Sequence, residues 1–188
     1  MTDPHARPPY IPVAEMTAAQ RAGHDAIVAG PRGSVPGPLR VWLVNPPLAE
    51  AAQRLGAYCR YGSHLPPRLS ELAILITGAF WRSGFEWVEH LPIALRAGVD
   101  PAAAEAIRTD AKPDLAAEDE AALLAFAQEL LRTRRVSDAT YARAVAALGR
   151  EAVVDLVGIL GYYTLISLTI NAFEVPLQDG AADPFPEP

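Results

Sequence analysis

The chain has 188 residues, of which 51% are hydrophobic and 20% charged, and its formal net charge at pH 7 is −6. This length is typical of one domain, and the apolar fraction excludes an intrinsically disordered chain. The acidic balance, 16 Lys and Arg against 22 Asp and Glu, argues against a nucleic-acid partner, which would require a basic surface.

Proline residues mark the ends of the chain and the joints between stretches rich in Ala, Leu, Glu and Arg. Residues 4–12 and 31–38 are expected to be extended or turn segments, because proline fixes its own backbone and disfavours helix in the residue before it. The stretches between the joints favour helix, and we find no alternating strand pattern and no internal repeat. The sequence therefore predicts an all-α protein, with helices over residues 17–28, 46–62, 66–81, 85–97, 102–108, 116–134, 137–148 and 151–172.

Three parts are expected along the chain: a proline-rich N-terminal segment with a short helix (1–38), an all-helical domain (39–176) and a proline-rich acidic tail (177–188). The tail from residue 181 onward is expected to be loose or to lie on a partner. The longest uncharged run, 156–170, is too short for a bilayer span of about 20 residues and indicates a buried helix. The N-terminus lacks the apolar stretch of a secretory signal, so we expect a cytoplasmic protein with no membrane partner.

The stretch from Glu71 to His90 holds the side chains best suited to chemistry. Glu86 and His90 are four positions apart and would share one face of a helix. A carboxylate beside an imidazole raises the pKa of the imidazole and orients its ring, so the pair can exchange protons near neutrality. If the joint at Ser83 and Gly84 folds two helices together, Glu71 would meet the same ring.

These residues also have structural interpretations, which stay open at this point. Ser83 and Glu86 have the spacing of a capping box, in which a serine and a glutamate satisfy the first backbone groups of a helix. Glu86 and His90 also fit an ordinary solvent-exposed helix pair. Glu71 lies near the start of a predicted helix, where a negative charge favours the helix dipole.

The order of residues around this stretch carries a family resemblance. Glu71 opens the sequence Glu-Leu-Ala-Ile, and His90 opens His-Leu-Pro-Ile-Ala-Leu-Arg-Ala-Gly. With these motifs, residues 68–99 resemble the carboxymuconolactone decarboxylase family, and the ending over residues 161–176 is similar to such members as well. The resemblance implies the alkyl hydroperoxidase D-like helical fold in a single domain. It also implies a homo-oligomer, either a trimer or a hexamer built from trimers.

The chain departs from the peroxidase branch of that family at two positions. The signature of the branch is a Glu, a Cys twelve positions later, a second Cys three further on and a His four beyond. Here Ser83 and Glu86 replace the two cysteines. The resemblance implies that this fold reduces peroxides through the thiols of these two cysteines. Because both are replaced here, an alkyl hydroperoxidase or peroxiredoxin-type activity is disfavoured for this chain. The single cysteine, Cys59, lies outside the motif and is expected to be a small core residue.

The decarboxylase branch of the family implies proton chemistry, in which loss of carbon dioxide leaves an enolate that must be stabilised and protonated. We expect His90 to be the proton donor, Glu71 to orient it and Glu86 to tune or share its proton. The predicted function is a cofactor-free lyase or proton-transfer enzyme acting on a small acid or lactone, such as one derived from an aromatic compound. The alternative is a non-catalytic, oligomeric protein that binds small molecules.

Five further residues of the motif are candidates for substrate binding. The guanidinium of Arg82 or Arg68 would match a substrate carboxylate with two parallel hydrogen bonds. Trp81 and Trp87 would form the wall of an apolar pocket, and Ser83 completes the group. The structural alternatives are surface charge for the arginines and core packing for the tryptophans.

The remaining polar candidates come from other parts of the chain. His5, His24 and His64 show no spacing that indicates a metal site, and one imidazole with two carboxylates is a poor ligand set, so no metal is expected. Hydroxyl donors are available from other predicted helices, and Asn171 is expected to cap the last helix. These hydroxyl donors are Tyr58, Tyr61, Tyr162 and Tyr163.

Overall fold

The computed structural model describes residues 7–177 and 180–186. Over these residues the chain forms α-helices and one short 3₁₀ helix, and no strand. This confirms the predicted all-α fold. The elements are the 3₁₀ helix Val13–Glu15, α1 (Ala18–Ala29), α2 (Gly37–Trp42), α3 (Pro46–Tyr61), α4 (Pro67–Phe80), α5 (Gly84–Ala97), α6 (Pro101–Arg108), α7 (Glu118–Thr133), α8 (Asp138–Leu148) and α9 (Arg150–Ala172).

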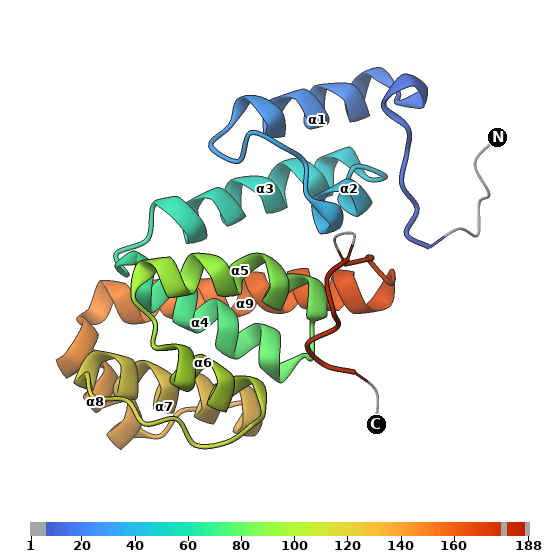
Figure 1. Ribbon diagram of the computed structural model, residues 1–188. Helices are drawn as coiled ribbons and strands as arrows, with labels where there is room; N and C mark the ends of the chain where they lie inside the picture. Colours follow the sequence, from blue (N-terminus) through green and yellow to red (C-terminus); the bar gives the residue numbers. More distant parts are fainter. Residues whose placement is uncertain (1–6, 178–179, 187–188) are drawn as a thin grey trace.

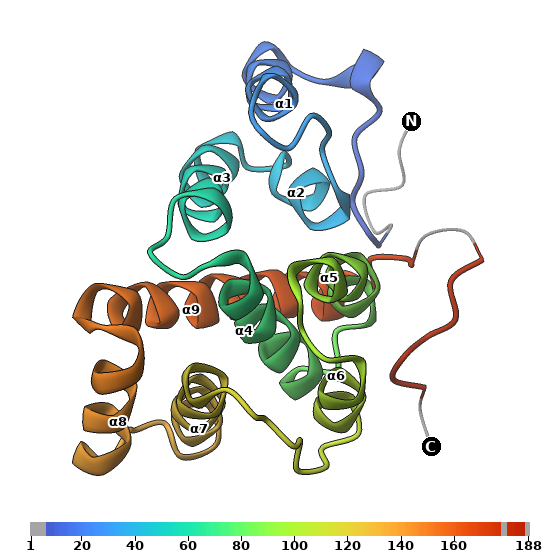
Figure 2. The same ribbon diagram turned by 60° about the vertical axis from the view of Figure 1, so that its left-hand side comes forward.

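The helices lie in three tiers, with α4, α5 and α9 in the middle (Figures 1 and 2). Helices α1, α2 and α3 lie on one side of this tier, and α6, α7 and α8 lie on the other. Helix α4 packs against α5, α6, α7 and α9. Ten consecutive residues of α4, 69–78, are buried. An acidic residue on this helix is therefore held away from water.

Helix α9 confirms the expectation of a buried apolar helix. By length and composition it is able to cross a membrane, but 61% of its most apolar window is buried inside the protein. It packs against α4 and α3, and also against α2, α5 and α8. These contacts are typical of the core helix of a folded domain.

Local signals set several helix boundaries as the sequence predicts. The Thr17 hydroxyl accepts a hydrogen bond from the backbone of Gln20, and the Gln20 side chain accepts one from the backbone of Thr17, which completes a capping box at the start of α1. Pro46 and Pro67 open α3 and α4, where a backbone N–H is not required. Gly98 ends α5 with a left-handed backbone, at φ 102°.

Helix α2 lies partly within a segment expected to be extended or turn. Its prolines fall at its beginning, with Pro36 as the N-cap residue and Pro38 in the first turn, so neither breaks the helix. The helix buries Leu39 and Trp42, and the Trp42 indole donates a hydrogen bond to the Thr169 hydroxyl on α9 at 3.0 Å. The contact with α9 therefore stabilises a helix too short to form alone.

The C-terminal segment is docked on the rest of the chain, which corrects the expected loose tail. Phe185 is buried, and its ring meets the Trp87 ring edge-on with 5.6 Å between centroids. Arg108 donates to the carbonyl of Pro184 at 2.6 Å, and Arg82 donates to that of Pro186 at 2.9 Å. Residues 178, 179, 187 and 188 of the predicted tail (177–188) lie outside the described residues.

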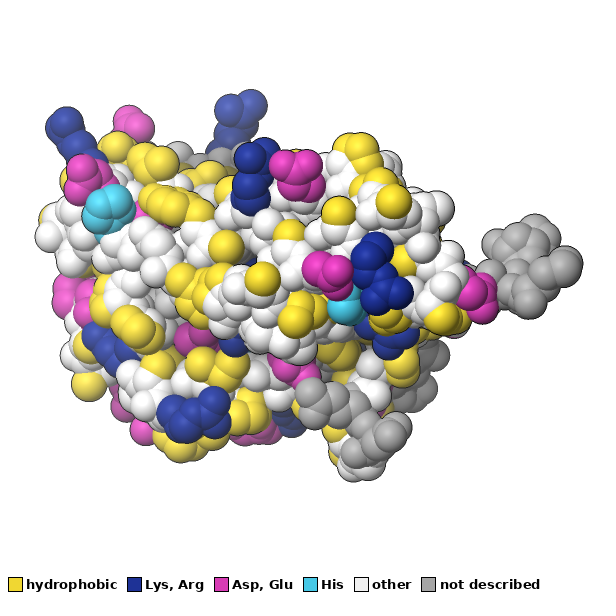
Figure 3. Space-filling model, turned by 90° about the horizontal axis from the view of Figure 1, so that it is seen from above, with side chains coloured by type: hydrophobic (Ala, Val, Ile, Leu, Met, Phe, Trp, Pro, Cys, Tyr) yellow, Lys and Arg dark blue, Asp and Glu magenta, His cyan; other side chains and the backbone are white. Residues whose placement is uncertain are grey.

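Charge is distributed in both signs over the face seen from above α1 (Figure 3). Basic and acidic side chains alternate there with apolar ones, and no field of a single sign extends over this face.

Candidate acid–base site

His90 lies on α5 between two buried carboxylates. Its Nδ1 hydrogen-bonds Oε2 of Glu71 at 2.7 Å, and its Nε2 lies 3.0 Å from Oε1 of Glu86. The three side chains expose only 4–6% of their surface. Oε1 of Glu86 has no well-aligned hydrogen bond, so its contact with His90 is an ion pair. The structure thus brings together the three residues that the sequence grouped.

The turn between α4 and α5 creates this arrangement. Arg82 adopts a left-handed backbone at φ 50°, and the backbone N–H of Ser83 donates to the carbonyl of Gly78 at 2.8 Å. The reversed chain lays α5 along α4, which brings His90 to Glu71 nineteen positions earlier. The i, i+4 spacing along α5 supplies Glu86 from the same helix.

The capping-box interpretation of Ser83 and Glu86 is wrong. Ser83 is the N-cap residue of α5, but its side chain makes no capping hydrogen bond and its hydroxyl is buried without a partner. The side chain of Glu86 faces His90 instead of the helix start. The solvent-exposed pair is also excluded, because both members are buried.

The two carboxylates keep His90 charged at neutral pH. Burial by itself lowers the pKa of His90, but the charge of Glu86 and the hydrogen bond with Glu71 outweigh it and raise the pKa to about 9. The sequence predicted an ionisation near neutrality from one neighbouring carboxylate. The ionisation lies higher because each ring nitrogen faces a carboxylate, which also leaves neither nitrogen available to a metal ion.

A cavity of about 40 Å³ adjoins His90 on the side of Glu86. The Tyr163 ring meets the His90 ring edge-on, with 5.2 Å between centroids, and the Tyr162 hydroxyl is buried without a partner. Burial raises the pKa of Tyr162 to about 12 and that of Tyr163 well above its usual value, so both phenols keep their protons. The remaining lining residues are Arg32, Pro36, Pro38, Leu39, Arg60, Phe85, Glu89 and Ile166.

The expected substrate-binding residues do not line this cavity. Arg68 forms ion pairs with Asp119, at 2.7 Å, and Glu120. Arg82 binds the C-terminal segment, as described above. The prediction placed both arginines by their nearness to the motif in sequence, whereas their side chains are held by acceptors outside the motif.

The other three residues of that predicted group also lie outside the lining. The Trp81 indole donates to the Thr164 hydroxyl at 3.1 Å, and Trp87 packs on Phe185. Ser83 is buried at the start of α5, away from the cavity lining. Arg32 and Arg60 are the arginines at the cavity, and no motif or spacing in the sequence indicates them.

Other polar candidates have structural partners. The Tyr58 hydroxyl and both the backbone N–H and Nδ1 of His64 lie 2.7 Å from the carboxylate of Asp155, which ties the segment before α4 to α9. The Asn171 amide donates to the carbonyl of Trp81 at 2.8 Å. Asn171 therefore caps the end of α4 and not that of its own helix. In the part of the chain that the structure describes, no group of His, Cys, Asp and Glu forms a metal site.

Cys59 lies in the core on α3, as expected, with 1% of its surface exposed. Burial raises the pKa of its thiol to about 11. We expect a thiol reagent such as 5,5′-dithiobis(2-nitrobenzoate) to react with native Cys59 at pH 7.5 about 100-fold or more slowly than with the chain unfolded in urea, because thiolate and access are both lacking. Rapid, stoichiometric reaction of the native protein would contradict this expectation, and Cys59→Ser is the blank.

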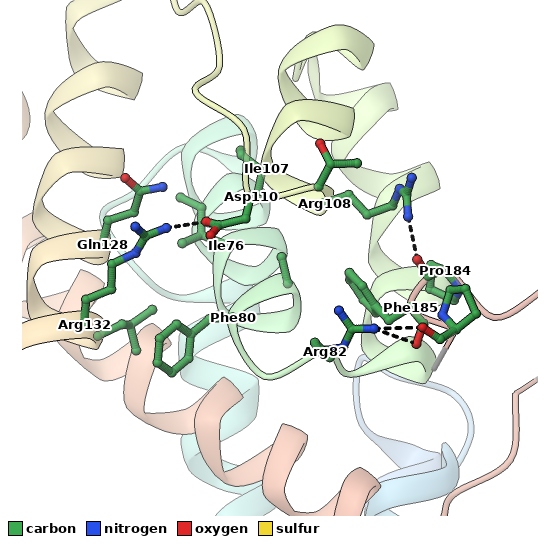
Figure 4. A pocket seen from close by; sticks show the side chains of 14 residues that line it. Ile76, Phe80, Arg82, Ile107, Arg108, Asp110, Gln128, Arg132, Pro184 and Phe185 are labelled. Atoms are coloured by element: carbon green, nitrogen blue, oxygen red, sulfur yellow. Dashed lines mark hydrogen bonds and ion pairs between the residues drawn. The ribbon is translucent and has the colours of Figure 1, made fainter. Parts of the chain in front are cut away.

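A second and larger hollow lies elsewhere, between α4, α6, α7 and the C-terminal segment, and measures about 620 Å³ (Figure 4). Three arginines line it, and each already has an acceptor. Arg132 pairs with Asp110, Arg108 with Glu105 and a tail carbonyl, and Arg82 with two tail carbonyls. Since it shares no lining residue with the cavity at His90, it is separate from the acid–base group.

Comparison with known proteins adds a family and a fold. Residues 46–129 match the model of the carboxymuconolactone decarboxylase family, and no functionally curated protein matches the chain. An uncharacterised peroxidase-related protein from Silicibacter sp. TM1040 superposes with a TM-score of 0.73 at 16% identity, covering 95% of this chain and 96% of that chain. An uncharacterised peroxidase-related protein from Ralstonia eutropha JMP134, described as having the alkylhydroperoxidase AhpD core, gives a TM-score of 0.73 at 18% identity, with 95% of each chain covered.

A third solved structure, the apo debrominase Bmp8, has a TM-score of 0.69 at 18% identity and covers 97% of this chain and 95% of that chain. At these identities the likeness shows the fold alone. It confirms the helical architecture predicted for the chain.

Proposed function

Because the chain belongs to the carboxymuconolactone decarboxylase family, we propose that it is an enzyme that transfers a proton to a carbanion or enolate formed from a small acid or lactone. The observation that supports this function is a buried imidazolium with one carboxylate at each nitrogen, placed beside a cavity with two phenol rings. The reaction class includes decarboxylation, in which the electron pair left by carbon dioxide is delocalised into a carbonyl.

The two glutamates have different positions and so different roles. Glu86 and His90 line the cavity, whereas Glu71 does not. Glu71 accepts the hydrogen bond from Nδ1 and fixes the ring, and Nε2 faces Glu86, which lines the cavity together with His90. In the proposed step the Nε2 proton passes to the substrate carbon, and the ring becomes neutral. Glu86 stabilises the imidazolium before the step. Afterwards its charge favours uptake of a new proton from solvent by the neutral ring.

The volume of the cavity limits the size of the chemical group that it can hold in this conformation. A volume of about 40 Å³ accommodates a few water molecules or one carboxylate-sized group, since one water needs roughly 10–15 Å³ in the same measure. A ring-sized substrate therefore requires the wall to move. The segment of the wall with the least regular structure precedes α2 and carries Pro36 and Arg32.

A solvent-isotope experiment tests the function and does not require the natural substrate to be identified first. Small lactone acids, carboxymuconolactone among them, are incubated with the full chain in D₂O and followed by NMR. We expect deuterium at the carbon next to a carbonyl, and kcat/KM that falls as pH rises through about 9, where His90 loses its proton. Saturable binding with neither product nor deuterium incorporation would favour the non-catalytic alternative. A rate independent of pH up to 10 would remove His90 as the acid.

A further inference from the structure

Arg32 carries a guanidinium whose inner edge is buried without an acceptor. The residue lies in the turn between α1 and α2, and its Nε and Nη2 atoms are both shielded from water and lack any hydrogen-bond partner. Leaving a buried donor unsatisfied destabilises the folded state, and more so when the group is charged. Such a group requires an explanation, and a ligand that completes it is one.

The two unsatisfied nitrogens form one edge of the guanidinium plane. An Nε–H and an Nη–H on the same edge point in parallel and match the two oxygens of a carboxylate. The same chemistry occurs elsewhere in the molecule with an internal partner, at Arg143, whose Nε and Nη2 bind the two oxygens of Glu118 at 2.7 and 3.0 Å. Arg32 is one of the residues that line the cavity, and its buried edge hydrogen-bonds no acidic side chain.

A third donor converges on the same place. The Tyr162 hydroxyl has no partner, and both it and Arg32 Nη2 occupy the space beside Gly56 on α3. A Cβ at position 56 would lie 2.8 Å from Arg32 Nη2 and closer still to the Tyr162 hydroxyl. Glycine at position 56 lets both groups approach the backbone of α3, so the Tyr162 hydroxyl from α9 and Arg32 Nη2 from the turn before α2 lie beside each other there.

The charges around the cavity identify the ligand class. Arg32, Arg60 and His90 contribute positive groups, and Glu86 and Glu89 contribute negative ones. His90 is paired with Glu86, whereas the buried edge of Arg32 hydrogen-bonds neither carboxylate. An anion with two coplanar oxygens has the chemistry to pair with this edge.

We propose that the Nε–Nη2 edge of Arg32, together with the Tyr162 hydroxyl over Gly56, is a subsite for a carboxylate of the substrate. This inference rests on the proposed function for its orientation, because the bound acid then lies in the same cavity as the proton of His90 Nε2. The carboxylate held there is one that the substrate retains, since pairing with a guanidinium stabilises the anion and opposes its loss as carbon dioxide. A decarboxylated substrate would therefore carry a second carboxylate.

Acetate and its neutral analogue acetamide test the subsite without turnover. Each is titrated into the full chain, and ring signals of His90 and Tyr162 are followed by NMR. We expect saturable shifts with acetate and none with acetamide. Arg32→Ala should raise the dissociation constant of acetate about tenfold or more, and Arg32→Lys should raise it several-fold, because a lysine lacks the planar edge. Arg54→Ala is the matched control, since Arg54 is exposed on α3 and should leave binding unchanged.

Two further measurements, an unfolding temperature and a second binding titration, separate a loss of the subsite from a loss of folding. Arg32→Ala should unfold at the same temperature as the parent chain or higher, because it removes unsatisfied buried donors. Tyr162→Phe should weaken acetate binding several-fold without loss of folding. Acetate that binds Arg32→Ala as tightly as the parent, or that fails to bind the parent, overturns the subsite. If binding depends on Arg32 but turnover is unchanged in His90→Gln, the subsite stands and the proposed acid does not.

Discussion

Replacing His90 by glutamine is expected to lower turnover by about 10²- to 10⁴-fold, the usual contribution of a positioned general acid. The amide of glutamine can still donate to Glu71, so the packing between α4 and α5 is preserved, but no proton is available for transfer. The measurement is kcat on the substrate found by deuterium incorporation, at a temperature where circular dichroism shows the variant folded.

Two comparisons give this result its meaning. Glu71→Gln keeps the imidazole and should reduce kcat less than His90→Gln, because it disturbs the orientation of the ring and leaves the acid itself present. Arg54→Ala should have no effect, since its side chain is 71% exposed on α3. Undiminished turnover in His90→Gln would exclude the imidazole as proton donor and would leave the buried triad with a structural role.

The free energy of unfolding is expected to fall as pH rises from about 6.5 to about 9. The pKa of His90 is about 9 in the folded chain and about 6.5 in an unfolded one, so only the folded state keeps the proton over this range. The stabilisation is complete below pH 6.5 and is lost as pH passes the folded pKa. The difference corresponds to at most about 3 kcal/mol, since one pKa unit equals about 1.4 kcal/mol.

Urea titrations at pH 6, 7.5 and 9 measure this loss, and His90→Gln is the control. The variant should show a flatter profile over the same range. Above pH 9 the buried Cys59 thiol and the Tyr162 phenol, whose pKa values are raised by burial, also begin to destabilise the folded state. The hydrogen bond with Asp155 also raises the pKa of His64, so the contribution of His90 is the difference between the parent chain and His90→Gln in the window below 9. Equal slopes in the parent chain and in His90→Gln would show that the imidazole does not supply the effect.

Most of the helical architecture could be predicted from local signals. Prolines at positions 46, 67 and 101 open helices, Gly98 ends one and Thr17 caps another, and each acts through the backbone of its own neighbourhood. The short helix α2 and the docked C-terminal segment escaped prediction for a common reason. Both are held by side chains remote in sequence, Thr169 for α2 and Arg82 with Arg108 for the tail.

The acid–base group could be predicted and its surroundings could not. Glu86 and His90 are one helical turn apart, and Glu71 is brought to them by a tight turn, so a short stretch of chain contains all three. Arg32 and Tyr162 reach the cavity from segments far from His90 in sequence, and their meeting depends on how α2 and α9 pack. Periodicity reports which face of a helix is apolar, but it does not report which helix lies opposite.

The residues that match the family model do not include all of the residues that line the cavity. Residues 46–129 include Glu71, Glu86 and His90, whereas Arg32 precedes this range and Tyr162 follows it. A truncated fragment cut to the matched range would keep its imidazole yet expose it to bulk water, with no phenol packed against the ring. Truncated or chimeric versions of this chain should therefore retain both flanking regions. Relatives with the same three residues are expected to differ in substrate specificity through sequence differences in these flanks.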